Sequence, residues 1–483
     1  MERESSSWPL WVSIPLTSSY RFRWVSCQLD RLRRCLSPRI RRALEELPET
    51  LDETYERTLL DIDDENWEYA HRLFQCIVVA LRPLRVEELA EFLSFKSEGG
   101  RLTFQADWRL ENPRDMVLST CSSLIAVVNV NGSPVIQFSH FSVKEYLTSN
   151  RIAEGRVSRH YIPLEPAHLF ITQACLSFLL QLDEHVTRKS VKAFPLAQYA
   201  GQYWTEHAEF GDVSSHTEDM IKRLFDPRNH HFANWVWIYD TITPDPLYLE
   251  APSRPESAPL HYAARHGFHR VAEWLITTCS QDVNVSGYIS STPLHIASDY
   301  GRLKVVQVLL KHHADVNTGD TNGWFPLHFA SSPEHHGPEI VRLLLEHGAA
   351  VDLKTDVGNT PLCLLSWDDG NLEDAKILLK HGADPNIKFF NGPLYRTLKK
   401  GHPGLVQLLL KHGADPNARD DDGQTFLHIA SKQGNLKVVQ RLLELGVDVN
   451  TQDNEGTTPL QQASRNGQTD IVELLSQHGA EGA

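Results

Sequence analysis

The second half of the chain repeats one arrangement of apolar and polar positions at nearly constant spacing. A short box of the type Thr-Pro-Leu-His opens each unit, and a glycine and an apolar stretch follow it. The seven boxes begin at Ala258, Thr292, Phe325, Thr360, Gly392, Thr425 and Thr458. Their intervals are 34, 33, 35, 32, 33 and 33 residues, and a nearly fixed period of this size is typical of a solenoid of stacked units.

The unit that begins at Thr292 illustrates the local structure that the pattern predicts. Thr292 is a helix-capping residue type, and Pro293 fits the first position of a helix, where its missing N–H is no loss. Gly301 ends this short helix, and the following LKVVQVLLK places its valines and leucines on one stripe of a second helix. One helix pair cannot bury its own apolar stripe, so we expect neighbouring pairs to cover one another in a curved stack with a concave surface.

The boxes, together with the endings HGADPN and GVDVN, resemble the ankyrin repeat. The resemblance covers residues 254–483 as seven repeats. It implies helix pairs joined by finger-like loops. It also implies that a protein partner binds the concave surface through the exposed residues of the first helices and through the finger tips.

A different pattern occupies residues 48–150. LPETLDETYERTLL begins with a proline and the capping residue Thr50, and ENWEYAHRLFQCIVVAL carries apolar residues from Trp67 to Leu81 at helical spacing. RPLRVEELAEFLSF and NPRDMVLSTCSSL predict two more helices, and the β-branched runs around Asn131 and Gly132 predict a hairpin. Helices followed by a hairpin indicate a winged helix.

The remaining part before the repeats is rich in helical patterns. In a winged helix the segment 115–123 would enter a DNA groove, yet its only positive charge is Arg114 at its start, so we expect protein as its contact. Residues 151–253 add many aromatic residues, which favours a packed helical connector that ends at the proline-rich TPDPLYLEAPSRPES. The predicted fold class is mainly α: an ankyrin-repeat solenoid preceded by a winged-helix domain and this helical connector.

Three stretches, LPETLDETYERTLL, RPLRVEELAEFL and FSHFSVKEYL, resemble the segment that follows the NACHT module in fungal signal-transducing ATPases, the STAND relatives of animal NLR receptors. Residues 21–47, with FRW and CQLDRLRRC, resemble the end of the NACHT module, and residues 1–20 stay unassigned. The resemblance implies a winged helix that packs on bound ADP, with His140 facing the phosphates. The alternative is that His140 caps or orients the helix that follows it.

The nucleotide-binding core of such a module is missing from the sequence. No G-x-x-x-x-G-K-[ST] phosphate loop occurs, and the strand that would carry the Mg²⁺-binding acid is absent too. We therefore expect no ATPase activity and no cofactor, and His140 is a cofactor-binding candidate only where an NTPase core is present. A truncated gene model, a degenerate paralogue and a true fragment are three open explanations.

Composition and charge narrow the classes of function. The formal net charge of −15 disfavours a nucleic-acid surface, because phosphate binding needs clustered Lys and Arg. No apolar run reaches the roughly 18 residues of a membrane span, so no membrane association is expected. The seven scattered cysteines contain no C-x-x-C pair, which indicates reduced thiols and a cytoplasmic protein, with the nucleus as the alternative.

The sequence also lacks the motifs of common enzymes and metal sites. No G-x-S-x-G or H-E-x-x-H occurs, so we expect no enzyme and no small-molecule substrate. The box histidines lie one or more repeats apart, which favours a structural hydrogen bond for each of them over a metal site. These histidines are His261, His295, His328 and His428.

The residues seven and eight places after each box start should line one surface, and the residue before a box lies on a finger. The predicted partner-binding residues are Arg265, Tyr300, Trp324, Trp367, Lys399, Lys400, Lys432 and Arg465. The three aromatic residues are expected to anchor the partner, because interface hot spots favour Trp and Tyr. The alternative for each of them is that it fills space beside the third and fourth repeats. The acidic run 420–422 and the basic pair 399–400 together predict a partner of mixed charge.

Two functions follow from these observations. The first is a non-enzymatic interaction protein, a sensor or scaffold that binds an unidentified protein partner through the ankyrin surface. The alternative is the regulatory back half of a NACHT NTP-dependent switch, whose phosphate loop a longer chain or a partner subunit would supply.

Overall fold

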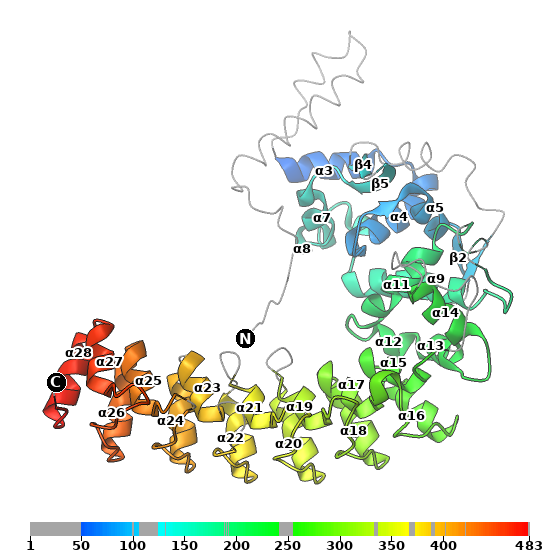
Figure 1. Cartoon of the computed structure of the whole chain (residues 1–483). Coiled ribbons are helices and arrows are strands. Elements are labelled where there is room, and N and C mark those ends of the chain that lie inside the picture. Colours follow the sequence, from blue (N-terminus) through cyan, green and yellow to red (C-terminus); the bar gives the residue numbers. More distant parts are fainter. Residues whose placement is uncertain are drawn as a thin grey trace. The chain divides into compact units, whose positions relative to one another are not determined.

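The computed structural model describes residues 50–98, 101–105, 124–130, 132–187, 189, 191, 193–240, 255–332, 337–366, 372–387, 392–400, 402–420 and 422–481. The chain divides into two compact units, Met1–Arg254 and Pro255–Ala483. Figure 1 shows the first unit in blue to green and the second in green to red. The predictions for residues 1–47 and for a helix at 112–123 lie outside the described residues.

The first described helix of unit 1, α3 (Leu51–Leu60), begins at the predicted cap. The Glu53 N–H donates to Thr50 Oγ1 at 3.1 Å, and the Thr50 N–H donates to Glu53 Oε2 at 3.3 Å. This reciprocal pair satisfies two backbone donors that the first turn would leave without partners. Tyr55 and Leu59 are buried on the inner side of the helix.

The predicted second helix is α4 (Trp67–Val79), which follows the short 3₁₀ turn η2 (Asp64–Asn66). The expectation that Leu81 belongs to its apolar stripe is wrong. The helix ends at Val79, the following Ala80 has an extended ψ of 131°, and Leu81 is exposed. The Leu81 N–H donates to Tyr199 Oη at 3.3 Å, so this backbone donor is satisfied outside the helix.

Two antiparallel sheets follow α4. The larger sheet has the order β1-β5-β4, built from β1 (Leu84–Arg85), β4 (Ile125–Val130) and β5 (Ser133–Phe138). The smaller sheet pairs β2 (Phe95–Glu98) with β3 (Arg101–Phe104), and α5 (Val86–Leu93) lies between β1 and β2 in sequence. The predicted hairpin is confirmed, because Val130 pairs with Ser133 across the turn that contains Gly132, which has a φ of 83°.

The rest of unit 1 is helical. Its elements are α7 (Phe141–Leu147), α8 (Asn150–Ala153), η4 (Ser158–His160), α9 (Leu164–Leu179), α11 (Ala197–Ala208), α12 (Val213–His216), α13 (Glu218–Phe225) and α14 (His231–Asp240). Their aromatic side chains form a core, as the sequence predicts: the ring of Trp235 lies 5.3 Å from that of Trp204 and 5.4 Å from that of Phe225. Phe92 of α5 contacts Tyr199 of α11 edge-on, with ring centres 5.7 Å apart, so α5 and these helices share one core.

Unit 2 is a row of helix pairs, one pair for each predicted repeat. The first helices are α15 (Pro259–Arg265), α17 (Pro293–Asp299), α19 (Pro326–Ala330), α21 (Pro361–Leu364), α23 (Pro393–Lys400), α25 (Phe426–Gln433) and α27 (Pro459–Arg465). The second helices are α16 (His269–Thr277), α18 (Leu303–Lys311), α20 (Pro338–Glu346), α22 (Leu372–Lys380), α24 (Pro403–Lys411), α26 (Leu436–Glu444) and α28 (Thr469–Gln477). Figure 1 shows these pairs following one another from α15 to α28.

The apolar stripe of each second helix is buried in this stack. In α18 the predicted stripe is confirmed, because Val305, Val306, Leu309 and Leu310 are all buried. Gly301 takes a φ of 64° after α17, a left-handed conformation that glycine adopts at little steric cost. Among the described residues, no helix combines the length and the apolar character that crossing a bilayer would require.

Candidate partner-binding surface

The box histidine of the second repeat ties its own helix cap to the third repeat. The Thr292 N–H donates to His295 Nδ1 at 3.0 Å, and the Thr292 hydroxyl lies 2.8 Å from the same nitrogen. His295 Nε2 lies 3.1 Å from the carbonyl oxygen of Trp324, which belongs to the following finger. Since Nδ1 accepts and Nε2 donates, the ring is neutral and its tautomer is set by these partners.

The bond from the box histidine to the following finger recurs along the stack. The Nε2 atoms of His261, His328 and His428 lie 2.9, 3.0 and 2.9 Å from the carbonyl oxygens of Ser291, Asn359 and Thr457. Burial lowers the pKa of all four box histidines, to about 4 for His328. The prediction of structural hydrogen bonds is therefore confirmed. Within the described residues, no group of His, Cys, Asp and Glu side chains has the arrangement of a metal site.

Two repeats replace the box histidine and keep the cap. The Cys363 N–H donates to Thr360 Oγ1 at 3.3 Å, and the thiol of Cys363 is buried. In the last repeat the Thr458 N–H donates to Gln461 Oε1 at 3.0 Å. The histidine-specific bond to the following finger is thus confined to the repeats that carry His.

Two of the predicted surface residues meet each other. The guanidinium carbon of Arg265 lies 5.1 Å from the centre of the Tyr300 ring, within the range of a cation–π contact. Both residues are half-buried, and the Arg265 carbonyl oxygen accepts a bond of 2.8 Å from Arg302 Nε. Place seven of the first repeat and place eight of the second therefore lie side by side.

The predicted anchor Trp324 has a structural role as well. Its half-buried ring lies 5.1 Å from the ring of Phe329 and 5.9 Å from that of His328, and its backbone N–H donates to Asp320 Oδ1 at 2.8 Å. These contacts favour the space-filling alternative for this residue.

The structure describes the side chains of only some of the other predicted partner-binding residues. Trp367 lies outside the described residues, and Lys399 and Lys400 end α23 without described side chains. Lys432 at the end of α25 and Arg465 at the end of α27 have exposed side chains at equivalent places of neighbouring repeats.

We use the name fingers for the five turns that precede first helices at residues 287–291, 320–324, 355–359, 420–424 and 453–457. Neighbouring fingers are bonded through their backbones. The Thr321 N–H donates to the Ile289 carbonyl oxygen at 3.0 Å, and the Asp356 N–H donates to the Asn322 carbonyl oxygen at 3.1 Å. These bonds join the finger tips of the second to fourth repeats in one edge.

This edge carries exposed apolar residues that sequence reasoning missed. Tyr288, Ile289 and Val357 are 67%, 40% and 60% exposed. Ile289 has a φ of 50°, which is unusual for a β-branched residue, and the next residue, Ser290, has a φ of 59°. An alignment of the fingers could have found this place, because Ser290 stands where the other fingers have a glycine. Those glycines are Gly323, Gly358, Gly423 and Gly456.

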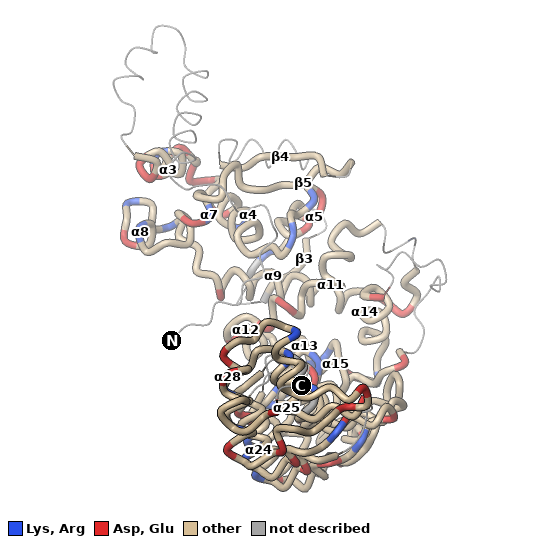
Figure 2. Tube along the Cα trace, turned by 60° about the vertical axis from the view of Figure 1, so that its left-hand side comes forward, with Lys and Arg blue, Asp and Glu red and all other residues tan. Residues whose placement is uncertain are grey.

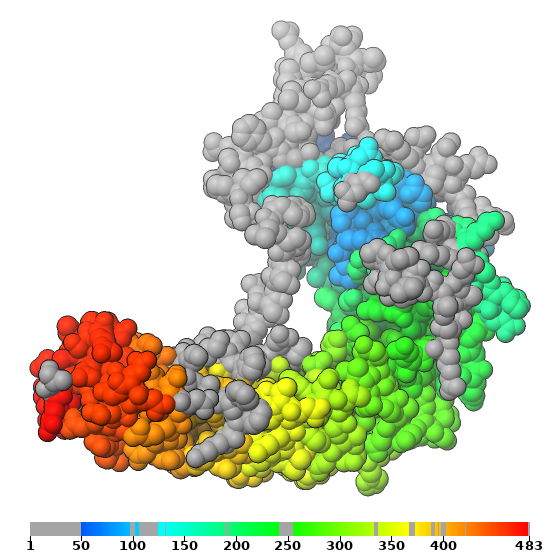
Figure 3. All heavy atoms as spheres, viewed as in Figure 1, coloured from blue at the N-terminus to red at the C-terminus, as the bar shows by residue number. Residues whose placement is uncertain are grey.

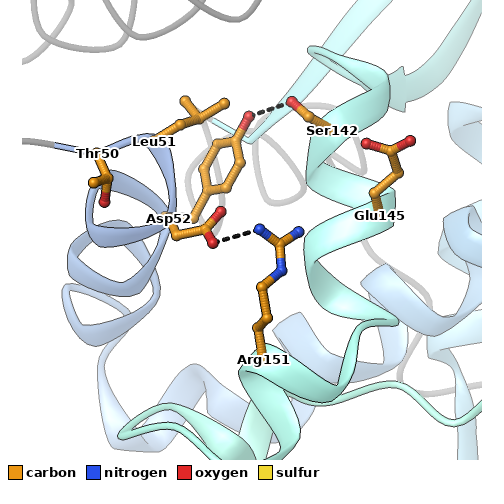
Figure 4. Close-up of a pocket in the computed structure, with 7 residues that line it drawn as sticks. Thr50, Leu51, Asp52, Ser142, Glu145 and Arg151 are labelled. Atoms are coloured by element: carbon orange, nitrogen blue, oxygen red, sulfur yellow. Dashed lines mark hydrogen bonds and ion pairs between the residues drawn. The ribbon is translucent and has the colours of Figure 1, made fainter.

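In unit 1, the structure bears on His140 at the beginning of α7. The Ser142 N–H donates to His140 Nδ1 at 3.3 Å, and the Ser142 hydroxyl lies 2.5 Å from the same nitrogen and 2.7 Å from Tyr55 Oη. His140 thus caps α7, which is the structural alternative for this residue. Ser142 and Tyr55 also line a pocket of about 310 Å³, which Figure 4 shows between α3, α7 and α8 with the ion pair of Arg151 and Asp52 at 2.6 Å.

Comparison with known proteins gives several partial matches. The protein L of the azaphilone pigments biosynthesis cluster of Monascus ruber is 32% identical over 292 residues, which are 56% of this chain and 61% of that protein. The chain therefore spans about three fifths of that relative. The ankyrin repeat protein nuc-2 of Neurospora crassa is 31% identical over 163 residues, 27% of this chain and 15% of that protein. The solved ankyrin repeat domain of Bcl-3 has 29% identity and a TM-score of 0.41, and the match covers 46% of this chain and 100% of that one.

The family model of ankyrin repeats matches residues 219–320, 313–389 and 394–482. The first match begins in α13, ahead of the first box, and the three together run through all seven helix pairs. Since these matches cover more than half of the sequence, the chain belongs to the ankyrin-repeat family.

Proposed function

We propose that this chain is a non-enzymatic interaction protein that binds a protein partner through the fingers and the ends of the first helices. The observation that carries the proposal is the contrast between the two kinds of position in each repeat. The box and stripe residues are buried and bonded within the stack, whereas the residues that differ between repeats reach solvent. Figure 3 shows one face of this stack, with the first repeats in green and the last in red.

The exposed residues have the chemistry of an interface. Tyr288 and Val357 present apolar surface at 67% and 60% exposure on bonded fingers, and Tyr300 offers an aromatic ring with Arg265 upon it. Aromatic residues and arginine are the types that most often dominate binding energy. Exposed apolar side chains on these bonded fingers contribute little to packing within the stack. Their apolar surface is therefore suited to contact with a partner protein.

We infer in addition that residues 48–150 form a winged helix. The inference is supported by α4, β1 and α5 followed by the β4–β5 hairpin, with β1 added to the hairpin as the third strand. The NACHT-switch alternative has weaker support, because the Nδ1 of its key residue His140 already caps α7. The protein-binding function needs no nucleotide.

Site-specific photo-cross-linking tests the proposal. A photoreactive phenylalanine analogue replaces Tyr300 in the full chain, and the matched control carries it at Lys437, which is exposed on the outer helix α26. In cells that make the protein, we expect a discrete cross-linked protein from position 300 and none from position 437. Excess wild-type chain should suppress this product, and a chain with Tyr300→Ala and Trp367→Ala should not. Equal products at both positions would contradict the function.

A further inference from the structure

The sixth and seventh repeats each carry one exposed cation at the same place. Lys432 lies in the last turn of the first helix of the sixth repeat, and Arg465 ends that of the seventh; they stand seven residues after Thr425 and Thr458, respectively. Arg465 makes a hydrogen bond of 3.4 Å to Thr457 Oγ1. Neither side chain forms an ion pair with any described residue.

Each of the same two repeats also carries one exposed anion at an equivalent finger place. Asp422 and Glu455 both directly precede the finger glycine, and their side chains are exposed. The neighbouring acids are engaged in the turn itself: Asp420 Oδ1 accepts from the Asp422 and Gln424 N–H groups at 3.0 and 2.8 Å. The carboxylates of Asp422 and Glu455 have no ion-pair partner among the described residues.

Among the described residues, no ion pair joins the cations and the anions of these two repeats. Lys432 lies seven residues after Thr425 and Asp422 three residues before it, and the guanidinium group of Arg465 bonds to Thr457 and not to Glu455. An ion pair needs a separation of about 4 Å. Elsewhere in the stack an ion pair does form, as between Arg441 and Glu444 at 2.8 Å. Two parallel rows of opposite charge therefore remain exposed, and Figure 2 marks the charged positions of the stack in blue and red.

We propose that these two rows bind an α-helical segment of the partner that carries acidic residues on one side and basic residues on the other, each repeated every seven positions. The inference rests on the proposed function and names the partner of that surface. Acidic side chains of the segment face Lys432 and Arg465, and basic side chains face Asp422 and Glu455. A polyanion is disfavoured because the finger carboxylates repel it.

The spacing of the rows selects a helix over an extended strand. Packed neighbouring helices lie about 8–10 Å apart, which sets the distance between Lys432 and Arg465 positions along the stack. Seven residues of a helix advance about 10.5 Å and return to nearly the same face. In a strand that distance takes about three residues, which point to opposite faces. Only a helix therefore presents like charges to both repeats from one side.

A synthetic peptide of about 21 residues tests the inference, with helix-favouring alanines, glutamates every seven positions and a lysine two places after each glutamate. Binding to the full chain is measured by fluorescence anisotropy at low and high salt. We expect saturable binding that weakens with salt, and at least tenfold weaker binding by the Lys432→Glu, Arg465→Glu double variant and by the Asp422→Lys, Glu455→Lys double variant. A chain with all four changes should prefer the peptide with glutamate and lysine exchanged.

Two controls make the result specific. The Lys411→Glu, Lys437→Glu variant changes two exposed lysines on α24 and α26 and should bind within twofold of the wild-type chain. A shuffled peptide of equal composition should bind at least tenfold more weakly than the patterned one. Equal binding of the two peptides, or no effect of the Lys432 and Arg465 changes in a folded variant, would overturn the inference. The cross-link at position 300 is independent of this outcome, so the two proposals fail separately.

Discussion

The Nδ1 atom of His168 on α9 lies 2.8 Å from the Nδ1 atom of His207 on α11, and both side chains are buried. A hydrogen bond between these nitrogens needs one ring to donate and the other to accept. His207 Nε2 lies 2.9 Å from Tyr199 Oη, and the His168 ring stacks on Phe210 at 4.1 Å. The pair therefore links the two helices only while at least one ring is neutral.

This pair predicts a loss of stability in mild acid. Burial lowers the pKa of His168 to about 4, with a further lowering by Lys144, and burial together with His168 lowers the pKa of His207 to about 3. Both values lie below the roughly 6.5 of an unfolded histidine, so the unfolded chain binds more protons. Stability is then full above about pH 6.5 and is lost as the pH falls towards these values. His207 alone accounts for roughly 1 kcal/mol per pH unit in this window.

Urea unfolding at about pH 7.5 and about pH 5 measures this effect. The His207→Gln variant is the control, because glutamine can bond to Tyr199 but does not titrate. Its stability should fall less between the two pH values than that of the wild-type chain. An identical loss in both chains would assign the acid sensitivity to other groups.

The buried carboxylate of Glu88 predicts a large loss of unfolding free energy when its charge is removed. Arg82 donates to its two oxygens at 2.7 Å each, and the Arg85 N–H donates at 2.8 Å. Burial opposes ionisation of Glu88, yet the bonds from Arg82 outweigh it and hold the pKa of the carboxyl below its usual value. The Glu88→Gln variant should lose about 3 kcal/mol of unfolding free energy, because two guanidinium groups lose their anion.

The matched control for this change is Glu68→Gln, which breaks the ion pair of Glu68 with Arg72 on an exposed side chain. It should change the free energy of unfolding by less than about 1 kcal/mol. Urea titration of both variants gives the comparison, and equal losses would contradict a special role of the buried carboxylate.

The bonds of the box histidines predict that substitutions of His428 reduce stability to different degrees. In the His428→Ala variant the Thr425 cap and the bond to the Thr457 carbonyl are both lost, with a cost of about 2 kcal/mol. The His428→Gln variant should lose less, because Gln461 shows that a glutamine at this box place still accepts from the capping threonine. Thermal and urea unfolding measure the series, and a glutamine variant as unstable as the alanine variant would contradict the two-part role.

Sequence alone predicts the repeats because their determinants are local. Thr292, His295 and Gly301 lie within one short helix and its ends, so spacing reveals both the cap and the stop. The pair of His168 and His207 joins residues 39 apart in a region without a repeat, and no spacing marks it.

Some features of the candidate surface can likewise be predicted from the sequence, and others cannot. The register of the repeats places Lys432 and Arg465 at equivalent exposed positions, which sequence can foresee. The packing of Trp324 on Phe329 depends on how the finger folds back onto its own helix, and this required the structure. The exposed Tyr288 beside the left-handed Ile289 became visible only when backbone angles and exposure were known.

The finger of the second repeat predicts a stabilising substitution. Ser290 holds a φ of 59° where the other fingers have glycines, among them Gly323 with a φ of 68°. A left-handed conformation costs a residue with a Cβ about 1–2 kcal/mol, and glycine avoids this cost while losing more chain entropy. The Ser290→Gly variant should therefore gain about 0.5 kcal/mol in urea unfolding. The control Ser464→Gly, inside helix α27, should lose about 0.5 kcal/mol, because there the backbone is helical and glycine brings only its entropy cost. A loss at both positions would contradict backbone strain at Ser290.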